Sequence, residues 1–351
     1  MILSNLSGLG YFLNILFLAI GVLFLIKGAD FFVASASSIA KKFKISSLVI
    51  GLTVVSFGTS APELAVSLIS AVKGETALAI GNVVGSNFAN LALVLGLSAL
   101  INPISVKKNI CKREFPFLLC STILLIIFSF DNLLSGYTGI ENLLSRGESI
   151  VFLCGLVAFC WLSIHFSKKD LELEGEQVEV EDEVKELPML KTIILLIVGL
   201  AGILIGAEFV TTPASTIATA IGVSLGVENS LMTSLVGLTV VAVGTSLPEL
   251  VTSVIAAKKG ENEIALGNVI GSNIFNILFI CGVSGTIKPL GISVEFLTDM
   301  VILLLLTILV FAFCKKGKLT RMSGCILLSV YVLYLAYIVI RLFNPFLVIP
   351  A

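Results

Sequence analysis

Two acidic residues, Glu63 and Glu249, lie within long apolar stretches of the sequence. Each follows a Gly-Thr-Ser-x-Pro turn, in the phrases GLTVVSFGTSAPELAVS (51–67) and GLTVVAVGTSLPELVTS (237–253), which are identical at 12 of 17 positions. An acidic side chain at the centre of a membrane-spanning helix costs about 2.5–3.5 kcal/mol on insertion scales, so it usually faces a cavity or a partner rather than lipid. The two glutamates are therefore the first candidates for a buried cation site.

A proline stands immediately before each glutamate, at Pro62 and Pro248. Proline has no amide hydrogen and clashes with the preceding turn, so both apolar helices should kink or break there. A break frees backbone carbonyls, and irregular backbone at membrane depth is tolerated only where it lines a cavity or is covered by protein. The hydroxyls beside each break are candidate cation ligands, and they could also cap the broken helix ends; they belong to Thr59, Ser60, Thr245 and Ser246.

A second phrase is repeated at the same offset of 186 residues, as GNVVGSNFAN (81–90) and GNVIGSNIFN (267–276), with seven of 10 positions identical. In a helix, residues four apart share one face, which groups Ser86 with Asn90 and Ser272 with Asn276. All of these donors are oxygens, which suit hard cations such as Ca²⁺ and Na⁺, whereas soft metals prefer Cys or His. The other amides of the phrases, at 87 and 273, are expected to pack or to form hydrogen bonds rather than to bind ions.

The composition indicates a polytopic membrane protein, because 57% of the 351 residues are hydrophobic, only 13% are charged and the mean hydropathy is +1.10. Soluble domains are about 45–50% apolar and about 25% charged. No basic cluster points to a nucleic-acid partner. Seven scattered cysteines without a CxxC pair, and one histidine, argue against a zinc or iron–sulfur site. The first basic residue, Lys27, follows the first apolar run, so no cleavable signal peptide is predicted.

The apolar stretches predict an all-α fold of ten transmembrane helices, at about 20 residues for each span. The first and sixth are long and should be tilted. The ten expected spans are 9–40, 45–71, 77–102, 114–130, 149–167, 191–221, 229–257, 264–287, 295–314 and 323–342.

Lysine and arginine predict the orientation, because cytoplasmic loops are enriched in them. With the N-terminus outside, 17 of the 22 basic residues fall in inside loops and four in outside loops. Five spans in each half is an odd number, so the second half must enter the membrane inverted, as in many transporters. We expect a first repeat at 1–168, an acidic cytoplasmic linker at 169–190 and an inverted second repeat at 191–351, with both termini outside.

A weaker repeat precedes each glutamate phrase: GADFFVASASSIA (28–40) matches GAEFVTTPASTIA (206–218) at an offset of 178. These faces are rich in small residues, which let helices approach closely. This pattern is expected for helices that slide against the rest of the protein. It is equally expected for helices in ordinary tight packing. Lys27 and Asp30 are expected to snorkel or to pair locally.

At these phrases the sequence resembles the cation/calcium antiporter superfamily, the sodium/calcium exchangers, and in particular their compact prokaryotic members. The resemblance covers nearly the whole chain. It implies four ion sites arranged as a diamond, with Glu63 and Glu249 binding Ca²⁺ and sharing in Na⁺ binding, and long first and sixth helices that slide to switch access. It also implies carbonyl or hydroxyl ligands from Thr59, Thr245, Ser56 and Ala242, and outer sodium ligands from Ser60, Ser246, Ser86 and Ser272.

One residue departs from the family pattern, because many exchangers have Asp where this chain has Asn276. The pocket then holds at most two negative charges, which two Na⁺ or one Ca²⁺ would balance. The first hypothesis is Na⁺/Ca²⁺ antiport by alternating access, and a Ca²⁺/H⁺ or K⁺-dependent antiporter that uses the same carboxylates is the alternative. A passive cation channel is a third possibility.

An enzyme is not expected, since GTSAPE is not a G-x-S-x-G elbow and the lone His165 lies at the wrong depth to activate Ser60. We expect no resident cofactor, with Ca²⁺ and Na⁺ as transported ions. The expected setting is the lipid bilayer of a prokaryotic plasma membrane, and the working expectation is a monomer.

Overall fold

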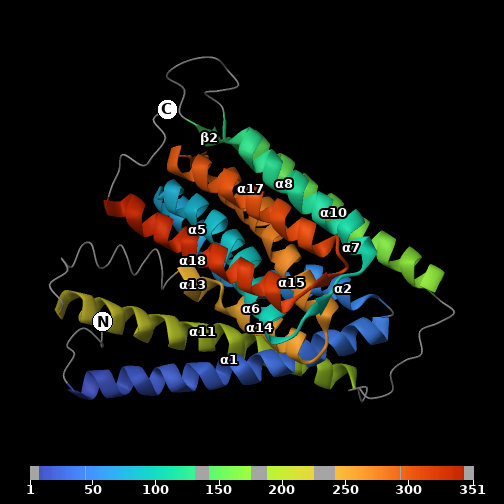
Figure 1. Ribbon diagram of the computed structural model, residues 1–351, viewed down its shortest axis with the longest axis horizontal. Coiled ribbons are helices and arrows are strands. Elements are labelled where there is room, and N and C mark those ends of the chain that lie inside the picture. Colours follow the sequence, from blue (N-terminus) through green and yellow to red (C-terminus); the bar gives the residue numbers. More distant parts are fainter. Residues whose placement is uncertain are drawn as a thin grey trace.

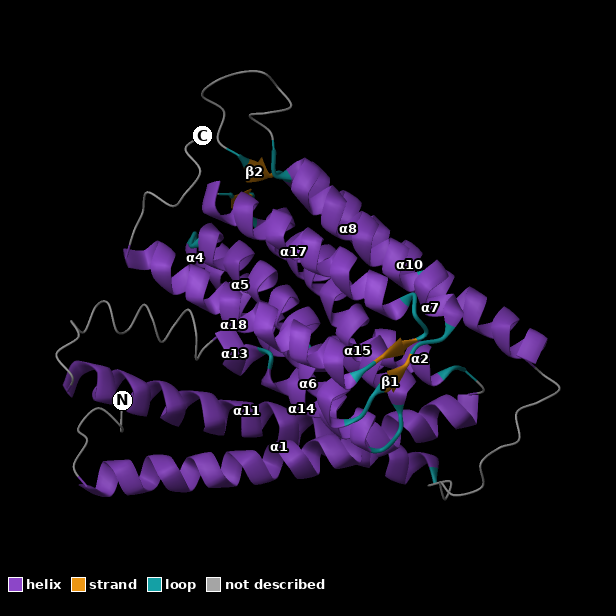
Figure 2. Ribbon diagram, viewed as in Figure 1, coloured by secondary structure: helices purple, strands orange, loops and turns teal. Residues whose placement is uncertain are grey.

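The computed structural model describes residues 8–43, 45–130, 142–174, 188–224, 242–292 and 294–343, and nearly all of them are helical (Figures 1 and 2). Most of the expected linker, residues 175–187, lies outside the described residues, as does the start of the expected seventh span, at 229–241. The elements of the first half are α1 (Gly8–Phe43), α2 (Ser47–Ile50), the π-helix η1 (Gly51–Val55), α3 (Ser56–Thr59), α4 (Ala61–Lys73), α5 (Thr76–Ala89), the π-helix η2 (Asn90–Val94), α6 (Leu95–Ile101), β1 (Ile104–Ser105), α7 (Lys108–Lys112), α8 (Glu114–Phe128), β2 (Leu143–Leu144) and α10 (Arg146–Glu174).

The second half presents a matching series of elements. These are α11 (Met189–Ser224), α13 (Ala242–Thr245), α14 (Leu247–Lys258), α15 (Asn262–Phe275), the π-helix η4 (Asn276–Ile280), α16 (Cys281–Ile287), β3 (Leu290–Gly291), α17 (Val294–Cys314), β4 (Lys318–Leu319) and α18 (Arg321–Phe343).

Seven helices among the described residues are long and apolar enough to cross a membrane, and a bent pair, Ser47–Thr59 with Ala61–Lys73, makes up to eight. The helix α8 has only 15 residues, and the expected seventh span is described only from Ala242 onward. The count of ten therefore stays a prediction. The expected length of the first and sixth spans is confirmed, because α1 and α11 have 36 residues each, well beyond the roughly 20 that a bilayer requires.

The burial pattern explains why the outer helices are apolar. The helix α15 is buried continuously from Ile264 to Phe275, whereas α1, α10 and α18 expose large apolar side chains such as Phe12, Val157 and Leu333. An apolar belt of this kind would be unfavourable in water and is the expected surface against lipid tails. The chain is a multi-pass α-helical membrane protein.

The two longest helices, α1 and α11, lie side by side along one edge of the bundle (Figure 1). Glycines set their separation: a Cβ on Gly199 would lie 2.7 Å from the backbone nitrogen of Phe32, and one on Gly28 would lie 2.8 Å from the carbonyl oxygen of Gly199. Such close backbone contact is possible only without side chains.

Two short strand pairs join loops that are distant in sequence (Figure 2). The strand β1 pairs with β4 through Ile104 and Leu319, and β2 pairs with β3 through Leu144 and Leu290. In each pair, one loop comes from the first half of the chain and the other from the second half.

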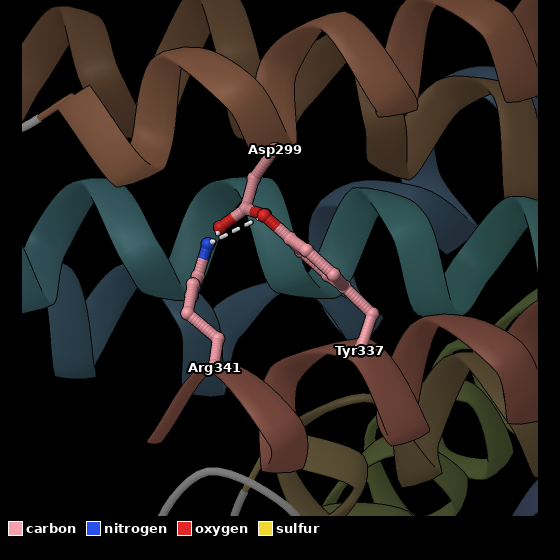
Figure 3. Close-up of polar contacts among 3 residues, drawn as sticks. All are labelled: Asp299, Tyr337 and Arg341. Carbon is pink, nitrogen blue, oxygen red and sulfur yellow. Dashed lines mark hydrogen bonds and ion pairs between the residues drawn. The ribbon is translucent and has the colours of Figure 1, made fainter. Parts of the chain in front are cut away.

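A buried ion pair joins α17 to α18 (Figure 3). The guanidinium of Arg341 donates to both carboxylate oxygens of Asp299 at 3.1 Å, and it also lies over the ring of Tyr337. Asp299 is only 2% exposed, and removing one partner of such a pair leaves a costly unpaired charge. About two turns before Arg341 on α18, Tyr334 stacks on Phe88 at a centroid distance of 3.8 Å, so the helix that carries the ion pair also packs close to Asn90.

Gly199→Ala is expected to lower the melting temperature of the purified protein, because the added methyl group meets backbone atoms of α1. Overpacking of this kind costs about 1–3 kcal/mol. The matched control is Gly155→Ala on α10, whose Cβ would meet only Leu278 methyl groups at 3.6 Å. Equal melting temperatures for the two variants would contradict the backbone-to-backbone packing of α1 and α11.

Candidate functional site

Both candidate glutamates lie just after a helix break, as the prolines predict. The helix α3 ends at Thr59, Ser60 has φ −79° and ψ 9°, and α4 then begins with a bend of 49° between the two segments. Ser246 has nearly the same backbone angles, φ −87° and ψ 5°, between α13 and α14. Each glutamate is the third residue of its new helix, where the helix dipole favours a negative charge.

The two breaks meet, and each glutamate accepts a hydrogen bond from the serine of the other half. Ser60 Oγ donates to Glu249 Oε1 at 2.9 Å, and Ser246 Oγ donates to Glu63 Oε1 at 3.5 Å. Both glutamates are 0% exposed. The cross-pairing brings the carboxyl groups, which are 186 residues apart in sequence, into one buried cluster.

One oxygen of each carboxyl group has no hydrogen-bond partner among the described residues: Glu63 Oε2 and Glu249 Oε2. Burying a polar atom without a partner costs about 1–3 kcal/mol, and more for a charged group. Two such oxygens in one cluster are well suited to a cation or a proton, either of which would relieve the repulsion between the carboxylates.

Hydroxyl groups surround this pair of carboxyl groups. Ser86 of α5 faces the Glu63 carboxyl group, while Ser272 of α15 and Thr59 face that of Glu249. The Ser272 hydroxyl is buried and forms no hydrogen bond in the described part of the chain. Each carboxyl group therefore lies between a serine of its own half and a serine of the opposite half.

Two asparagines that the sequence analysis did not single out hold the glutamate turns in place. Asn82 Nδ2 donates to the Glu63 carbonyl at 3.1 Å and to Ser67 Oγ at 2.9 Å. Asn268, its counterpart at the offset of 186, donates to the Glu249 carbonyl at 3.4 Å and to Ser253 Oγ at 2.9 Å.

Asn268 also connects the two halves directly, because Thr59 Oγ1 donates to its Oδ1 at 3.1 Å. The signal for these asparagines was present in the sequence: each is the second residue of a repeated GN-x-x-GSN phrase. Each also lies four residues before the serine of the expected ligand face, Ser86 or Ser272, so the same spacing argument could have found it.

The predicted ligands Asn90 and Asn276 begin the π-helices η2 and η4, an irregularity that is frequent at functional sites. They are not equivalent. Asn276 Nδ2 donates to Asn87 Oδ1 at 2.9 Å, whereas neither amide atom of Asn90 has a partner among the described residues. No hydrogen bond in the described structure joins either side chain to a glutamate.

Asn87 and Asn273, which are expected from the sequence to pack or to form hydrogen bonds, do form them. Asn87 donates to the backbone carbonyl of Asn273 at 3.3 Å, and Asn273 donates to the backbone carbonyl of Val269 at 2.7 Å.

The remaining candidates lie on the short helices before the breaks. The Ser56 carbonyl accepts from the amide of Ser60 at 3.0 Å and from Thr59 Oγ1 at 3.3 Å, so it is engaged within its own helix in this conformation. Ala242 begins α13 and Thr245 ends it. Of the two expectations for Lys27 and Asp30, the local pair is wrong, because Asp30 forms its ion pair with Lys259, 229 residues away, where the turn before α15 packs against α1. Snorkelling of Lys27 stays a prediction.

The chemistry of the cluster is restricted to oxygen. No group of three or more His, Cys, Asp and Glu side chains that could hold a metal occurs in the described residues. Two carboxyl groups with hydroxyl and amide oxygens are typical ligands for hard cations. Two broken helices that meet inside a membrane-embedded bundle, with an acidic residue at each break, are features of a secondary cation transporter.

Comparison with known proteins agrees with this class. The profile of the family described as "Sodium/calcium exchanger protein" matches residues 13–165 and 191–340, and the chain belongs to this family. The sodium/calcium exchanger MaX1 of Methanosarcina acetivorans is 35% identical over 92% of this chain and 97% of its own. The inner membrane protein YrbG of Escherichia coli is 33% identical over 91% of this chain and 94% of its own.

A solved structure of the sodium-calcium exchanger NCX_Mj, soaked with Na⁺ and Ca²⁺, superposes with a TM-score of 0.75 at 31% identity and covers 92% of this chain and 98% of its own. Cation antiport is therefore the class of activity that the family defines.

Asn268→Ala is expected to destabilise the protein by about 1–3 kcal/mol, because it removes the buried hydrogen bonds of Asn268 with Thr59 Oγ1, Ser253 Oγ and the Glu249 carbonyl. It should also weaken Ca²⁺ binding, since Thr59 and Glu249 belong to the glutamate cluster. Thermal unfolding with and without Ca²⁺ measures both effects. The control is Thr307→Val, which removes a buried hydroxyl that bonds only within α17. An unchanged Ca²⁺-dependent shift in Asn268→Ala would exclude the positioning role.

Proposed function

We propose that the protein exchanges Na⁺ for Ca²⁺ by alternating access, with the two ions competing for one site built on Glu63 and Glu249. The observation that supports this most directly is the pair of buried carboxyl groups, each with one unpartnered oxygen, that meet across the two broken helices. The names of MaX1 and NCX_Mj point to the same ions.

The charge of the site supports competition between the ions. Two carboxylates carry two negative charges, which one Ca²⁺ or two Na⁺ would neutralise. The proposed ligands around the glutamates are Thr59, Thr245, Ser56, Ala242, Ser60, Ser246, Ser86, Ser272, Asn90 and Asn276. A low-dielectric interior strongly disfavours an unbalanced charge. The change between the two access states should therefore be faster when the site is loaded and neutral than when it is partly filled.

Two inverted repeats, 1–168 and 191–351, supply the two access states in this proposal. The strand pairs support the arrangement, because β1 (Ile104–Ser105) and β3 (Leu290–Gly291) are related by the offset of 186 and each pairs with a loop of the other half. Basic residues assign the first pair to the cytoplasmic face and the second to the outer face. The linker 169–190 then joins the repeats in the cytoplasm.

Access would switch by movement of α1 and α11 relative to the glutamate helices. The exposed edge position of this pair and its glycine contacts support movement of the two helices as one unit (Figure 1). A small cavity that reaches Ser60 and is lined by Phe57, Ala61, Leu64, Phe275, Phe279 and Ile280 supports a route from the outer half of the bundle. By analogy with YrbG, we place the protein in the cytoplasmic membrane of a prokaryote, and a monomer would contain a complete site.

Ca²⁺/H⁺ exchange is the second candidate, and the residue that favours it is Asn276. With an amide at this position the site has only two acids, both of which could bind protons. Accumulation of ⁴⁵Ca²⁺ in proteoliposomes, with gradients of Na⁺, K⁺ and pH imposed one at a time, separates the candidates. A Na⁺ gradient alone should drive accumulation. Accumulation driven only by the pH gradient would replace the proposal, and uptake that needs no counter-ion would indicate a channel.

Glu63→Gln and Glu249→Gln are each expected to abolish Na⁺-driven ⁴⁵Ca²⁺ exchange, because either change removes one of the two charges that hold Ca²⁺. The matched control is Glu148→Gln. Glu148 accepts from the amide of Ser145 at 2.8 Å at the start of α10, and Gln can serve the same capping role. Exchange retained by either site variant would contradict the assignment.

Calcium binding should weaken with roughly the second power of the Na⁺ concentration, because two Na⁺ must leave the site for one Ca²⁺ to bind. Calorimetric titration of the purified protein with Ca²⁺ at several Na⁺ concentrations measures this dependence. A dependence near the third power would show that a further Na⁺ binds in spite of the two-charge limit.

A further inference from the structure

We propose that two polar latches, one at each membrane face, alternately hold the α1–α11 pair, a device that rests on the alternating access proposed above. The first latch joins α1 to the turn between α14 and α15 and is closed in this structure. The second would join α11 to the turn between α4 and α5 and is open. Each latch closes one face while the other face is accessible.

The closed latch consists of two contacts. Lys259 Nζ lies 3.0 Å from Asp30 Oδ1 and donates to the Asp30 carbonyl at 3.0 Å. About two turns farther along α1, Ser37 Oγ donates to Glu261 Oε1 at 2.7 Å. Basic residues assign this turn to the cytoplasmic face, so the latch holds α1 where a cytoplasmic opening would require it to move.

The same turn is present in the other half. Residues 73–75 and 259–261 both read Lys-Gly-Glu, and the central glycines have similar left-handed backbones, with φ +88° at Gly74 and φ +79° at Gly260. In both turns the glutamate is the residue that precedes the next helix, α5 or α15. Lys73 and Glu75 thus present the same pair of side chains as Lys259 and Glu261.

The partners on the long helix are also duplicated. Asp30 and Ser37 of α1 correspond, at the offset of 178, to Glu208 and Ser215 of α11. A complete second set of latch residues therefore exists: a lysine and a glutamate on the turn, and a carboxylate and a serine on the helix.

This second set does not make the corresponding contacts here. The side chains of Lys73 and Glu75 are exposed, and among the described residues neither has an ion pair or a hydrogen bond. Within the described part of the chain, Glu208 accepts only from Thr212 of its own helix, at 2.6 Å. Ser215 Oγ is buried and has no hydrogen-bond partner among the residues that the structure describes.

A protein with two alternating states should show one set of these contacts formed and the equivalent set open in each state. The present structure has this pattern. A contact present in only one state shifts the equilibrium toward that state by its own free energy. In the opposite state, Lys73 would pair with Glu208 and Glu75 would accept from Ser215, while the contacts of Lys259 and Glu261 would open. The latches thus bias access without touching the ion site.

Zero-length carbodiimide cross-linking of the unmodified protein in proteoliposomes tests the proposal, because it joins a lysine to a carboxylate only where the two are in contact. Mass spectrometry should detect both Asp30–Lys259 and Glu208–Lys73 cross-links. Asp30→Asn or Lys259→Gln should raise the yield of the Glu208–Lys73 product. The Lys107–Glu263 pair, 2.7 Å apart and on the same turn region but not on α1, is the internal reference.

The control variant Lys107→Gln removes that reference pair and should leave the Glu208–Lys73 yield unchanged. Absence of the Glu208–Lys73 product, or an equal yield in Asp30→Asn and the unmodified protein, would overturn the latch. Measurement of ⁴⁵Ca²⁺ exchange on the same preparation separates the two proposals. Exchange without the cross-link refutes only the latch, whereas no exchange under any gradient refutes the proposed function.

Discussion

The meeting of two buried carboxyl groups is the constraint on which the rest of the structure depends. Glu63 and Glu249 are fully buried, and each is stabilised by a helix N-terminus and by a serine of the opposite half. The helix N-terminus belongs to the same half as its glutamate, but the serine does not. The two halves must therefore be assembled before either acid is fully stabilised, which couples the fold of the bundle to the formation of the site.

Small residues make that assembly possible. A Cβ on Gly267 would lie 2.8 Å from the carbonyl oxygen of Leu48, and one on Gly271 would lie 2.6 Å from that of Leu52, so α15 packs directly on the backbone of α2 and η1. This close approach brings Asn268 within reach of Thr59. The glycines of the repeated phrase thus act at a distance from the ions, by setting how near the two broken helices can come.

Much of this organisation could be predicted from the sequence, and the failures have a common cause. The helix breaks, the duplicated phrases and the long first and sixth helices follow from proline chemistry, repetition and apolar length, all of which are local in sequence. The exchange of serines between the two glutamates, the bracing by Asn82 and Asn268, and the pairing of Asp30 with Lys259 depend on contacts across the halves. No local pattern specifies from which of two equivalent serines a carboxyl group will accept a hydrogen bond. Lys27 is closer to Asp30 in sequence, but Lys259 is the residue that forms the ion pair in the folded protein.

The asymmetry between the two halves has a physical consequence for coupling. Asn276 donates to Asn87, whereas the Asn90 amide has no partner among the described residues, so the Asn276 amide braces the interior without adding charge. In the proposed cycle the site is then neutral with one Ca²⁺ or two Na⁺, and it keeps a net charge in every partly filled state. An uncompensated charge in the low-dielectric interior costs several kcal/mol, or about a thousandfold in rate for each 4 kcal/mol. Strict exchange would then need no dedicated gate at the ion site. The cost of burying an uncompensated charge would by itself slow the change of access while the site is only partly filled.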